Sequence, residues 1–84
     1  MIQEIHTIVS PFKGTIEKVF IKENSYIYEW EKLFLIKSFE GDIMEISIGA
    51  SGIITSLCVK EGDHVSTENI LAHLKDDLLI TGSD

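Results

Sequence analysis

The stretch IKSFEGDIMEISI, residues 36–48, decides the fold. Two apolar-rich segments with β-like spacing flank the sequence Glu40-Gly41-Asp42, and this pattern is typical of two strands joined by a tight turn. Glycine suits such a turn because it adopts positive φ angles without a steric penalty. The sequence before this hairpin resembles the sequence after it. We therefore expect the hairpin to join two copies of one small β unit, and its tip is the first place to look for function.

The two copies are related by an offset of 38 residues. Apolar residues recur where a core is needed, and glycine or asparagine recurs where a turn needs a positive φ angle. The matched positions are Gly14 with Gly52, Ile16 with Ile54, Val19 with Leu57, Ile21 with Val59, Lys22-Glu23 with Lys60-Glu61, Asn24 with Gly62, Ile27 with Val65 and Leu33 with Leu71.

Each copy contains one irregular step in its alternation. The apolar residues follow at spacings of two, three and two, and a step of three within a period of two moves a side chain to the other face unless the strand bulges there. Each copy is therefore expected to bend once. Two bent units wrapped around one core predict an all-β flattened barrel or sandwich of two four-stranded antiparallel sheets with a pseudo-twofold axis.

Local signals place several of the boundaries. A first strand is expected over residues 5–9, ended by Pro11, and a second over residues 15–22, followed by a turn at Asn24 and Ser25. Residues 66–74 fit a strand or a weak helix. The whole chain, residues 1–84, is interpreted as a single domain with a core of about residues 5–75 and a C-terminal tail over residues 76–84.

Composition excludes several classes of function. The formal charge is −7, from fourteen acidic residues and seven lysines with no arginine, so we expect no nucleic-acid binding. We also expect no signal peptide and no membrane span. The single cysteine, Cys58, lies between apolar neighbours and is expected to be a buried or half-buried hydrophobe in a reducing compartment. The predicted location is the cytoplasm.

Two segments resemble a known family. The segment SPFKGTI, residues 10–16, resembles the opening of biotinyl and lipoyl carrier domains, and VKEGDHV, residues 59–65, followed by Ile70-Leu71, resembles their closing segment. The resemblance implies a hammerhead-like β-sandwich whose central hairpin carries a lysine. In such domains the lysine amine forms an amide with the cofactor, and its long stem lets the attached group swing between active sites.

The position of that lysine holds other residues here. Counting forward from Leu33 places the attachment position at Glu40, and counting back from Gly52 places it at Gly41, so the hairpin is one residue longer than the family pattern. The nearest amine is Lys37, which is expected to be an outward lysine on an exposed strand. The predicted interaction hairpin is Phe39, Glu40, Gly41 and Asp42.

Other groups point only weakly to chemistry. His6, His64 and His73 are far apart in sequence, and no metal site is predicted. The acids Glu40, Asp42 and Glu45 are interpreted as a solubility feature of the hairpin, and no catalytic residues are expected.

Apolar and aromatic side chains outside the core suggest contacts. Tyr26, Tyr28 and Trp30 alternate and are expected on one face of a strand, either as a lid over the end of the barrel or as a binding patch. The tail segment Leu78-Leu79-Ile80 is expected to dock on the sandwich or to pair with another chain.

These patterns predict a biotinyl/lipoyl-like module that lacks the attachment lysine and carries no cofactor. It would act as an interaction or regulatory domain in an enzyme complex or as a homo-oligomer. One alternative is a biotin or lipoate carrier subunit, of the carboxylase or 2-oxo acid dehydrogenase type, modified at Lys37. A second is a lipoyl-like piece of a membrane-fusion adaptor, which ranks lower because such domains carry a long helical insertion at this hairpin.

Overall fold

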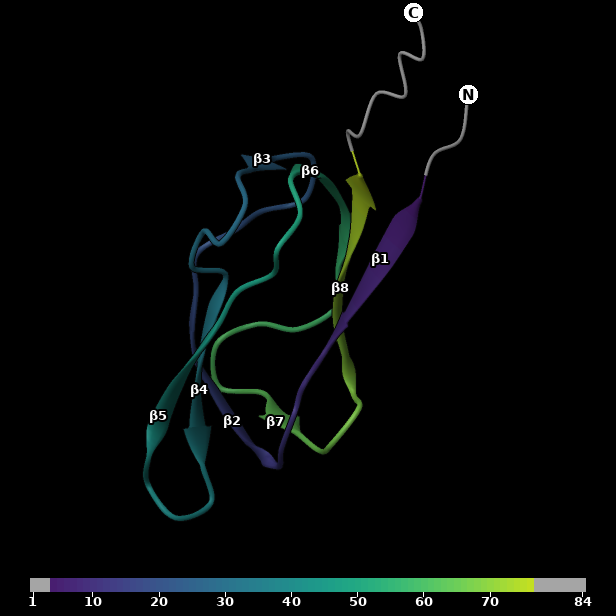
Figure 1. Ribbon diagram of the computed structural model, residues 1–84. Helices are drawn as coiled ribbons and strands as arrows, with labels where there is room; N and C mark the ends of the chain where they lie inside the picture. The colour runs from purple at the N-terminus through teal and green to yellow at the C-terminus, as the bar shows by residue number, and fades with distance from the viewer. Residues whose placement is uncertain (1–3, 77–84) are drawn as a thin grey trace, which may run out of the picture.

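The chain folds into two β-sheets that face each other (Figure 1). The computed structural model describes residues 4–76, and this part of the chain contains strands and turns but no helix. Consequently, none of the described segments is a helix that could cross a bilayer. The prediction of an all-β fold with two four-stranded antiparallel sheets is confirmed.

Eight strands make up the two sheets. They are β1 (Ile5–Val9), β2 (Gly14–Val19), β3 (Tyr26–Ile27), β4 (Phe34–Ser38), β5 (Ile43–Ile46), β6 (Gly52–Leu57), β7 (His64–Val65) and β8 (Ile70–Asp76). One sheet has the order β1-β8-β6-β3 and the other has the order β5-β4-β2-β7.

The sequence repeat is also a repeat of structure. β5, β6, β7 and β8 lie about 38 residues after β1, β2, β3 and β4, and exchanging each strand with its counterpart converts one sheet order into the other. The pseudo-twofold relation therefore swaps the two sheets. Two turn positions repeat it in their backbone. Asn24 and its counterpart Gly62 have φ angles of 70° and 94°, and Trp30 and its counterpart Glu68 have φ angles of 63° and 70°.

The bend predicted for each copy is present as a β-bulge. The register of β2 against β4 shifts between Ile16 and Lys18, and that of β6 against β8 shifts between Ile54 and Ser56. Both shifts fall inside the three-residue step of the apolar pattern. The bulge keeps the apolar residues before and after it directed toward the core.

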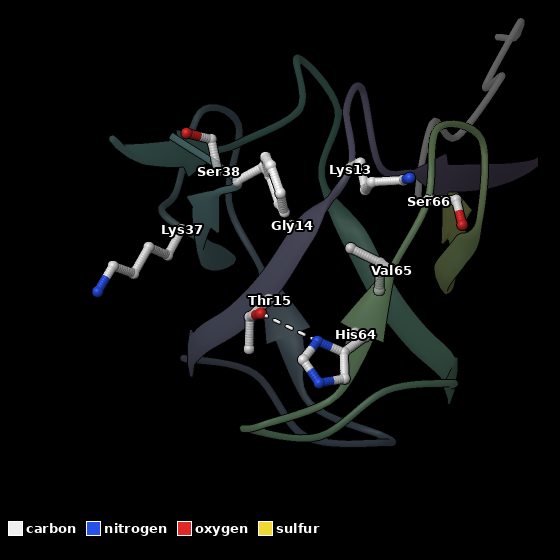
Figure 2. Close-up of a pocket in the computed structure, with 9 residues that line it drawn as sticks. Lys13, Gly14, Thr15, Lys37, Ser38, His64, Val65 and Ser66 are labelled. Carbon is white, nitrogen blue, oxygen red and sulfur yellow. Dashed lines mark hydrogen bonds between the residues drawn. The ribbon is translucent and has the colours of Figure 1, made fainter. Parts of the chain in front are cut away.

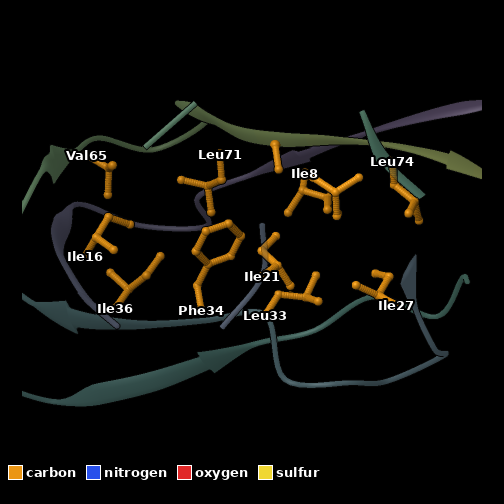
Figure 3. Close-up of a cluster of buried hydrophobic side chains, with 12 residues drawn as sticks. Ile8, Ile16, Ile21, Ile27, Leu33, Phe34, Ile36, Val65, Leu71 and Leu74 are labelled. Atoms are coloured by element: carbon orange, nitrogen blue, oxygen red, sulfur yellow. The ribbon is translucent and has the colours of Figure 1, made fainter. Parts of the chain in front are cut away.

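The core lies between the sheets (Figure 3). Its twelve buried residues are aliphatic apart from one phenylalanine: Ile8, Ile16, Ile21, Ile27, Leu33, Phe34, Ile36, Ile54, Val65, Leu71, Ala72 and Leu74. Ser10 is the one buried polar residue identified among residues 4–76, and its hydroxyl donates to the carbonyl of Phe12 at 2.6 Å. A buried hydroxyl needs such a partner because an unsatisfied one is costly.

The end of β2 differs from its prediction, and the structure resolves the ambiguous segment 66–74. β1 matches its prediction, but β2 ends at Val19 instead of residue 22, because its pairing with β4 ends at Val19 and Phe34. Beyond that pair, the amide of Phe20 still donates to the carbonyl of Leu33 at 2.9 Å. The ambiguous segment 66–74 forms a turn and then the strand β8, not a helix.

The predicted burial of Cys58 is wrong. Its side chain is exposed and forms no disulfide. The half-buried neighbours Leu57 and Val59 turn inward, so the residue between them faces outward, as alternation in an extended segment requires.

Candidate functional site

The β4–β5 hairpin is the candidate site, and its strands are paired in a regular register. Lys37 lies opposite Ile43, and Ile36 lies opposite Met44. The connection is the four-residue turn at residues 39–42, where the amide of Ser38 donates to the carbonyl of Asp42 at 2.7 Å. The predicted turn is therefore confirmed, with Phe39 included in it.

Ser38 braces this turn with its side chain. Its Oγ accepts hydrogen bonds from the backbone amides of Glu40, at 3.2 Å, and Asp42, at 3.1 Å. Its carbonyl accepts the amide of Gly41 at 2.9 Å, and Gly41 has a φ angle of 97° that suits glycine. The sequence reasoning missed this role, although a serine immediately before a turn is a known signal for such local bonds.

The apex presents an aromatic ring and acids. Phe39 is 88% exposed, more than any other large hydrophobic residue identified in the described chain, and Glu40, Gly41 and Asp42 are also exposed. Ile43 extends this apolar surface onto β5 at 48% exposure. A buried aromatic contributes far more to stability than an exposed one, so Phe39 contributes little to the fold.

Lys37 lies below the apex, in the strand. Its side chain is exposed, and its neighbours across the sheet are Thr15 on β2 and Ile43 on β5. The structure thus places it as an outward strand lysine, three residues before Glu40. The fold does not test whether biotin or lipoate is attached to Lys37, and this attachment stays an alternative prediction.

The apex lies at one end of the molecule. β1 begins and β8 ends at the opposite end of the sandwich (Figure 1). Residues 39–42 are exposed, so within the described part of the chain the apex is open to a large partner.

The three histidines lie in separate places, each with its own neighbour. His64 Nδ1 is 3.2 Å from Thr15 Oγ1, and His73 Nδ1 is 2.7 Å from Ser56 Oγ. These side-chain contacts tie neighbouring strands together across the sheets.

The third histidine belongs to a cluster that the sequence reasoning missed. His6 Nε2 is 2.7 Å from Asp76 Oδ2, and ligand atoms of Glu4, His6 and Asp76 all lie within 4.8 Å of one another. Antiparallel pairing of β1 with β8 brings these residues together, which spacing along the chain could not show. The hydrogen bond joins the two strands at their open end, and the predicted absence of a metal site stays a prediction.

The acidic residues of the hairpin do not act as one group. Glu45 Oε2 is 3.3 Å from Lys32 Nζ, so this carboxylate is already paired. Glu40 and Asp42 use backbone amides to brace the turn, and their side chains are exposed. This geometry supports the interpretation of solvated charge.

The prediction that three aromatic residues share one strand face is wrong. β3 contains only Tyr26 and Ile27, and Tyr28 begins a turn closed by the Glu31 amide, which donates to the carbonyl of Tyr28 at 3.1 Å. Tyr26 and Tyr28 still meet edge to face, with ring centroids 5.0 Å apart. Trp30 lies in the turn with a positive φ angle, and its ring covers Gly49 while remaining 69% exposed.

The predicted docking of Leu78-Leu79-Ile80 lies outside the described residues. The same holds for most of the tail assigned to residues 76–84, of which only Asp76 is described, as the last residue of β8.

Comparison with known proteins gives a structural match but no sequence match. No family model matches the chain, and no curated protein matches it. Among solved structures, the fold is similar to part of the urea carboxylase of Kluyveromyces lactis, with a TM-score of 0.74 and 17% sequence identity. The match covers 84% of this chain and 6% of that chain. The chain therefore shares the fold of a small segment of a much longer carboxylase.

Proposed function

We propose that this chain is a non-catalytic module of the biotinyl/lipoyl type that binds a protein partner through its β4–β5 hairpin. The observation that carries the proposal is the composition of the apex: Phe39 is 88% exposed there, and the turn contains no amine. An exposed aromatic side chain at a braced turn is suited to a contact, because aromatic residues are enriched at protein interfaces.

The fold supports this proposal at a coarser level. The similarity to a segment of a carboxylase agrees with the resemblance of residues 10–16 and 59–65 to carrier domains. A carrier works by presenting its hairpin to other active sites, so a carrier-like domain without the lysine keeps a presented hairpin and no cofactor. The partner would be an enzyme complex or a second copy of the chain.

The setting we propose is a reducing compartment such as the cytoplasm. The chain has one cysteine, and its exposed thiol forms no disulfide. Proteins of oxidising compartments usually pair their cysteines.

Crosslinking from the apex tests the contact. A photoreactive phenylalanine analogue at position 39 is expected to capture one defined partner in cells of the source organism, identified by mass spectrometry. The matched control is the same analogue at position 20, where Phe20 is 45% exposed and lies 5.5 Å from the Lys32 ammonium. Capture of a second copy of the chain would identify a homo-oligomer.

Competition gives this experiment a clear negative outcome. Unlabelled wild-type protein should abolish the crosslink, and a Phe39→Ser variant should not, although its melting temperature should be unchanged because the ring is exposed. Equal competition by the two proteins, or equal capture from positions 39 and 20, would exclude the apex as the contact.

The alternative carrier function is tested by intact mass. Lys37 is exposed, so a ligase could reach its amine. After co-expression with a biotin ligase or a lipoate ligase, we expect the unmodified mass, because the amine extends from a strand and not from the turn that a ligase would meet. A single cofactor adduct that is absent from Lys37→Ala would instead establish a covalent carrier.

The adaptor alternative receives less support. The strands of the hairpin are joined by only four residues, 39–42, braced by Ser38. This connection holds no helical insertion of the kind that such adaptors carry.

A further inference from the structure

A second feature near the hairpin is a cavity of about 350 Å³ (Figure 2). It lies where the start of β2, the end of β4 and β7 meet. A cavity of this size falls in the range of small-molecule sites. Its lining is Lys13, Gly14, Thr15, Lys37, Ser38, Phe39, His64, Val65 and Ser66.

The charge of this lining is opposite to that of the protein. Two lysines and a histidine line the cavity and no carboxylate does, although the chain contains fourteen acids and has a net charge of −7. The lysine ion pairs identified within residues 4–76 use Lys32 and Lys60. Lys13 and Lys37 thus have no acidic partner in the described chain, and both ammonium groups are available to a bound anion.

Strand pairing gathers these polar groups on one outward face. Thr15 is the register partner of both Lys37 on β4 and His64 on β7, so the three side chains form a row across the sheet. The contact of 3.2 Å between Thr15 Oγ1 and His64 Nδ1 orients the imidazole and leaves Nε2 free to contact a ligand. Ser66 follows His64 by two residues and adds a hydroxyl.

The lysines flank this row. In Figure 2, Lys13 and Lys37 extend in opposite directions from the two sides of the cavity. Both are exposed, and a lysine side chain has a flexible four-carbon stem. Each ammonium group can therefore turn toward an anion held at the histidine and the hydroxyl groups.

The internal repeat provides a comparison for this composition. The counterparts of Thr15, His64 and Ser66, 38 residues away, are Ile53, Tyr26 and Tyr28. The same backbone therefore carries an isoleucine and two bulky aromatic side chains at the other end of the molecule. Of the two cationic positions, Lys37 is matched by Lys75, whereas Lys13 is matched by Ser51. The fold therefore requires neither the histidine, the aliphatic hydroxyls of Thr15 and Ser66, nor the second lysine, and this combination of groups occurs at one end only.

We propose that this cavity binds a small ligand through a phosphate or carboxylate group. Ammonium groups, an imidazole and hydroxyls are the donors that such oxyanions accept, and charge-assisted hydrogen bonds are about twice as strong as neutral ones. Val65 and Phe39 give the cavity an apolar wall for the rest of the ligand. The proposal does not depend on a protein partner at the apex.

Chemical-shift titration tests the site on the whole chain. Inorganic phosphate and acetate are added separately to ¹⁵N-labelled protein at constant ionic strength set with chloride. We expect saturable shifts of the Thr15, His64 and Ser66 amides with at least one of the two anions. Saturation by phosphate alone identifies a phosphate site, saturation by acetate alone a carboxylate site, and saturation by both a general oxyanion site.

Charge-matched variants show whether the cavity is responsible. Lys13→Gln combined with Lys37→Gln should weaken binding by about tenfold or more, the factor expected from losing about 1.4 kcal/mol. Lys18→Gln combined with Lys22→Gln removes the same charge from exposed positions outside the cavity and should leave the affinity within about twofold. No saturable shift with either anion, or equal weakening by both double variants, would overturn the proposal.

Discussion

Replacing Phe34 with alanine is expected to destabilise the domain by about 3–5 kcal/mol. Phe34 is fully buried and lies at the start of β4, between its register partners Val19 on β2 and Ile46 on β5. Truncation removes a ring from the middle of the core and leaves a cavity that the surrounding β-branched side chains fill poorly. Total stabilities of small domains are about 5–15 kcal/mol, so much of the margin would be lost.

Urea unfolding followed by circular dichroism measures this change, and Phe39→Ala is the matched control. The same substitution at an 88% exposed position is expected to change the free energy of unfolding by less than about 0.5 kcal/mol. A loss below about 1 kcal/mol for Phe34→Ala, or equal losses for the two variants, would contradict the described packing, since core truncations of this kind cost several times more.

The fold could be predicted because its main signals are local. Alternating apolar residues reveal the strands, the three-residue step locates each bulge, and the repeated Gly14 and Gly52 mark the same strand start in both halves. Two of the errors also have local causes. Tyr28 and Trp30 continue an alternating pattern into a turn, and Cys58 has apolar neighbours that turn inward while it faces out.

The repeat was visible in the sequence, but the hydrogen bonds that its equivalent residues form between the two copies were not. Glu23 and Glu61 occupy equivalent positions in the two copies. Each carboxylate accepts a hydrogen bond from a backbone amide in the other half of the chain. Glu23 Oε2 is 3.2 Å from the amide of Leu57, and Glu61 Oε2 is 3.4 Å from that of Val19. Each copy thus caps the end of the other copy's bulged strand. These reciprocal hydrogen bonds depend on how the two sheets face each other. The spacing of residues along the chain does not reveal that arrangement.

The two candidate sites also differ in whether the sequence could predict them. The apex could be predicted because the turn residues and the spacing from Leu33 and Gly52 lie within one short stretch. The basic cavity could not, because the pairing of β2 with β7 brings Thr15 next to His64 from 49 residues away. A long-range register is fixed by the whole fold and not by local pattern.

The second large effect is expected at a glycine. Replacing Gly52 with alanine should destabilise the domain by about 2–5 kcal/mol, through backbone overpacking and strain together. Gly52 has a φ angle of 154°, and a Cβ atom there would overlap the carbonyl oxygen of Lys75 and come within 2.9 Å of its carbonyl carbon. The obstructing atoms belong to the backbone of β8, so no rotamer change relieves the overlap.

The cost follows from where β8 lies. It pairs with β6 on one side and with β1 on the other, so moving Lys75 away from Gly52 strains both ladders. Gly14 has the same relation to the carbonyl of Lys37 on β4, which explains why the repeat keeps glycine at both positions. Gly14→Ala is therefore expected to be similarly damaging, because β4 also lies between two strands, β2 and the edge strand β5, as β8 lies between β6 and the edge strand β1.

Gly62→Ala separates the overlap from the backbone conformation. Gly62 has a φ angle of 94°, and a Cβ atom there would meet nothing within 4 Å, so only the conformational strain of about 1 kcal/mol is expected. Melting temperature and urea midpoint should therefore fall much further for Gly52→Ala than for Gly62→Ala. Equal losses would show that strain alone makes these glycines necessary. A larger loss at Gly52 would show that glycine is required there because β6 approaches the backbone of β8 closely. This pairing joins the two central strands of the sheet β1-β8-β6-β3.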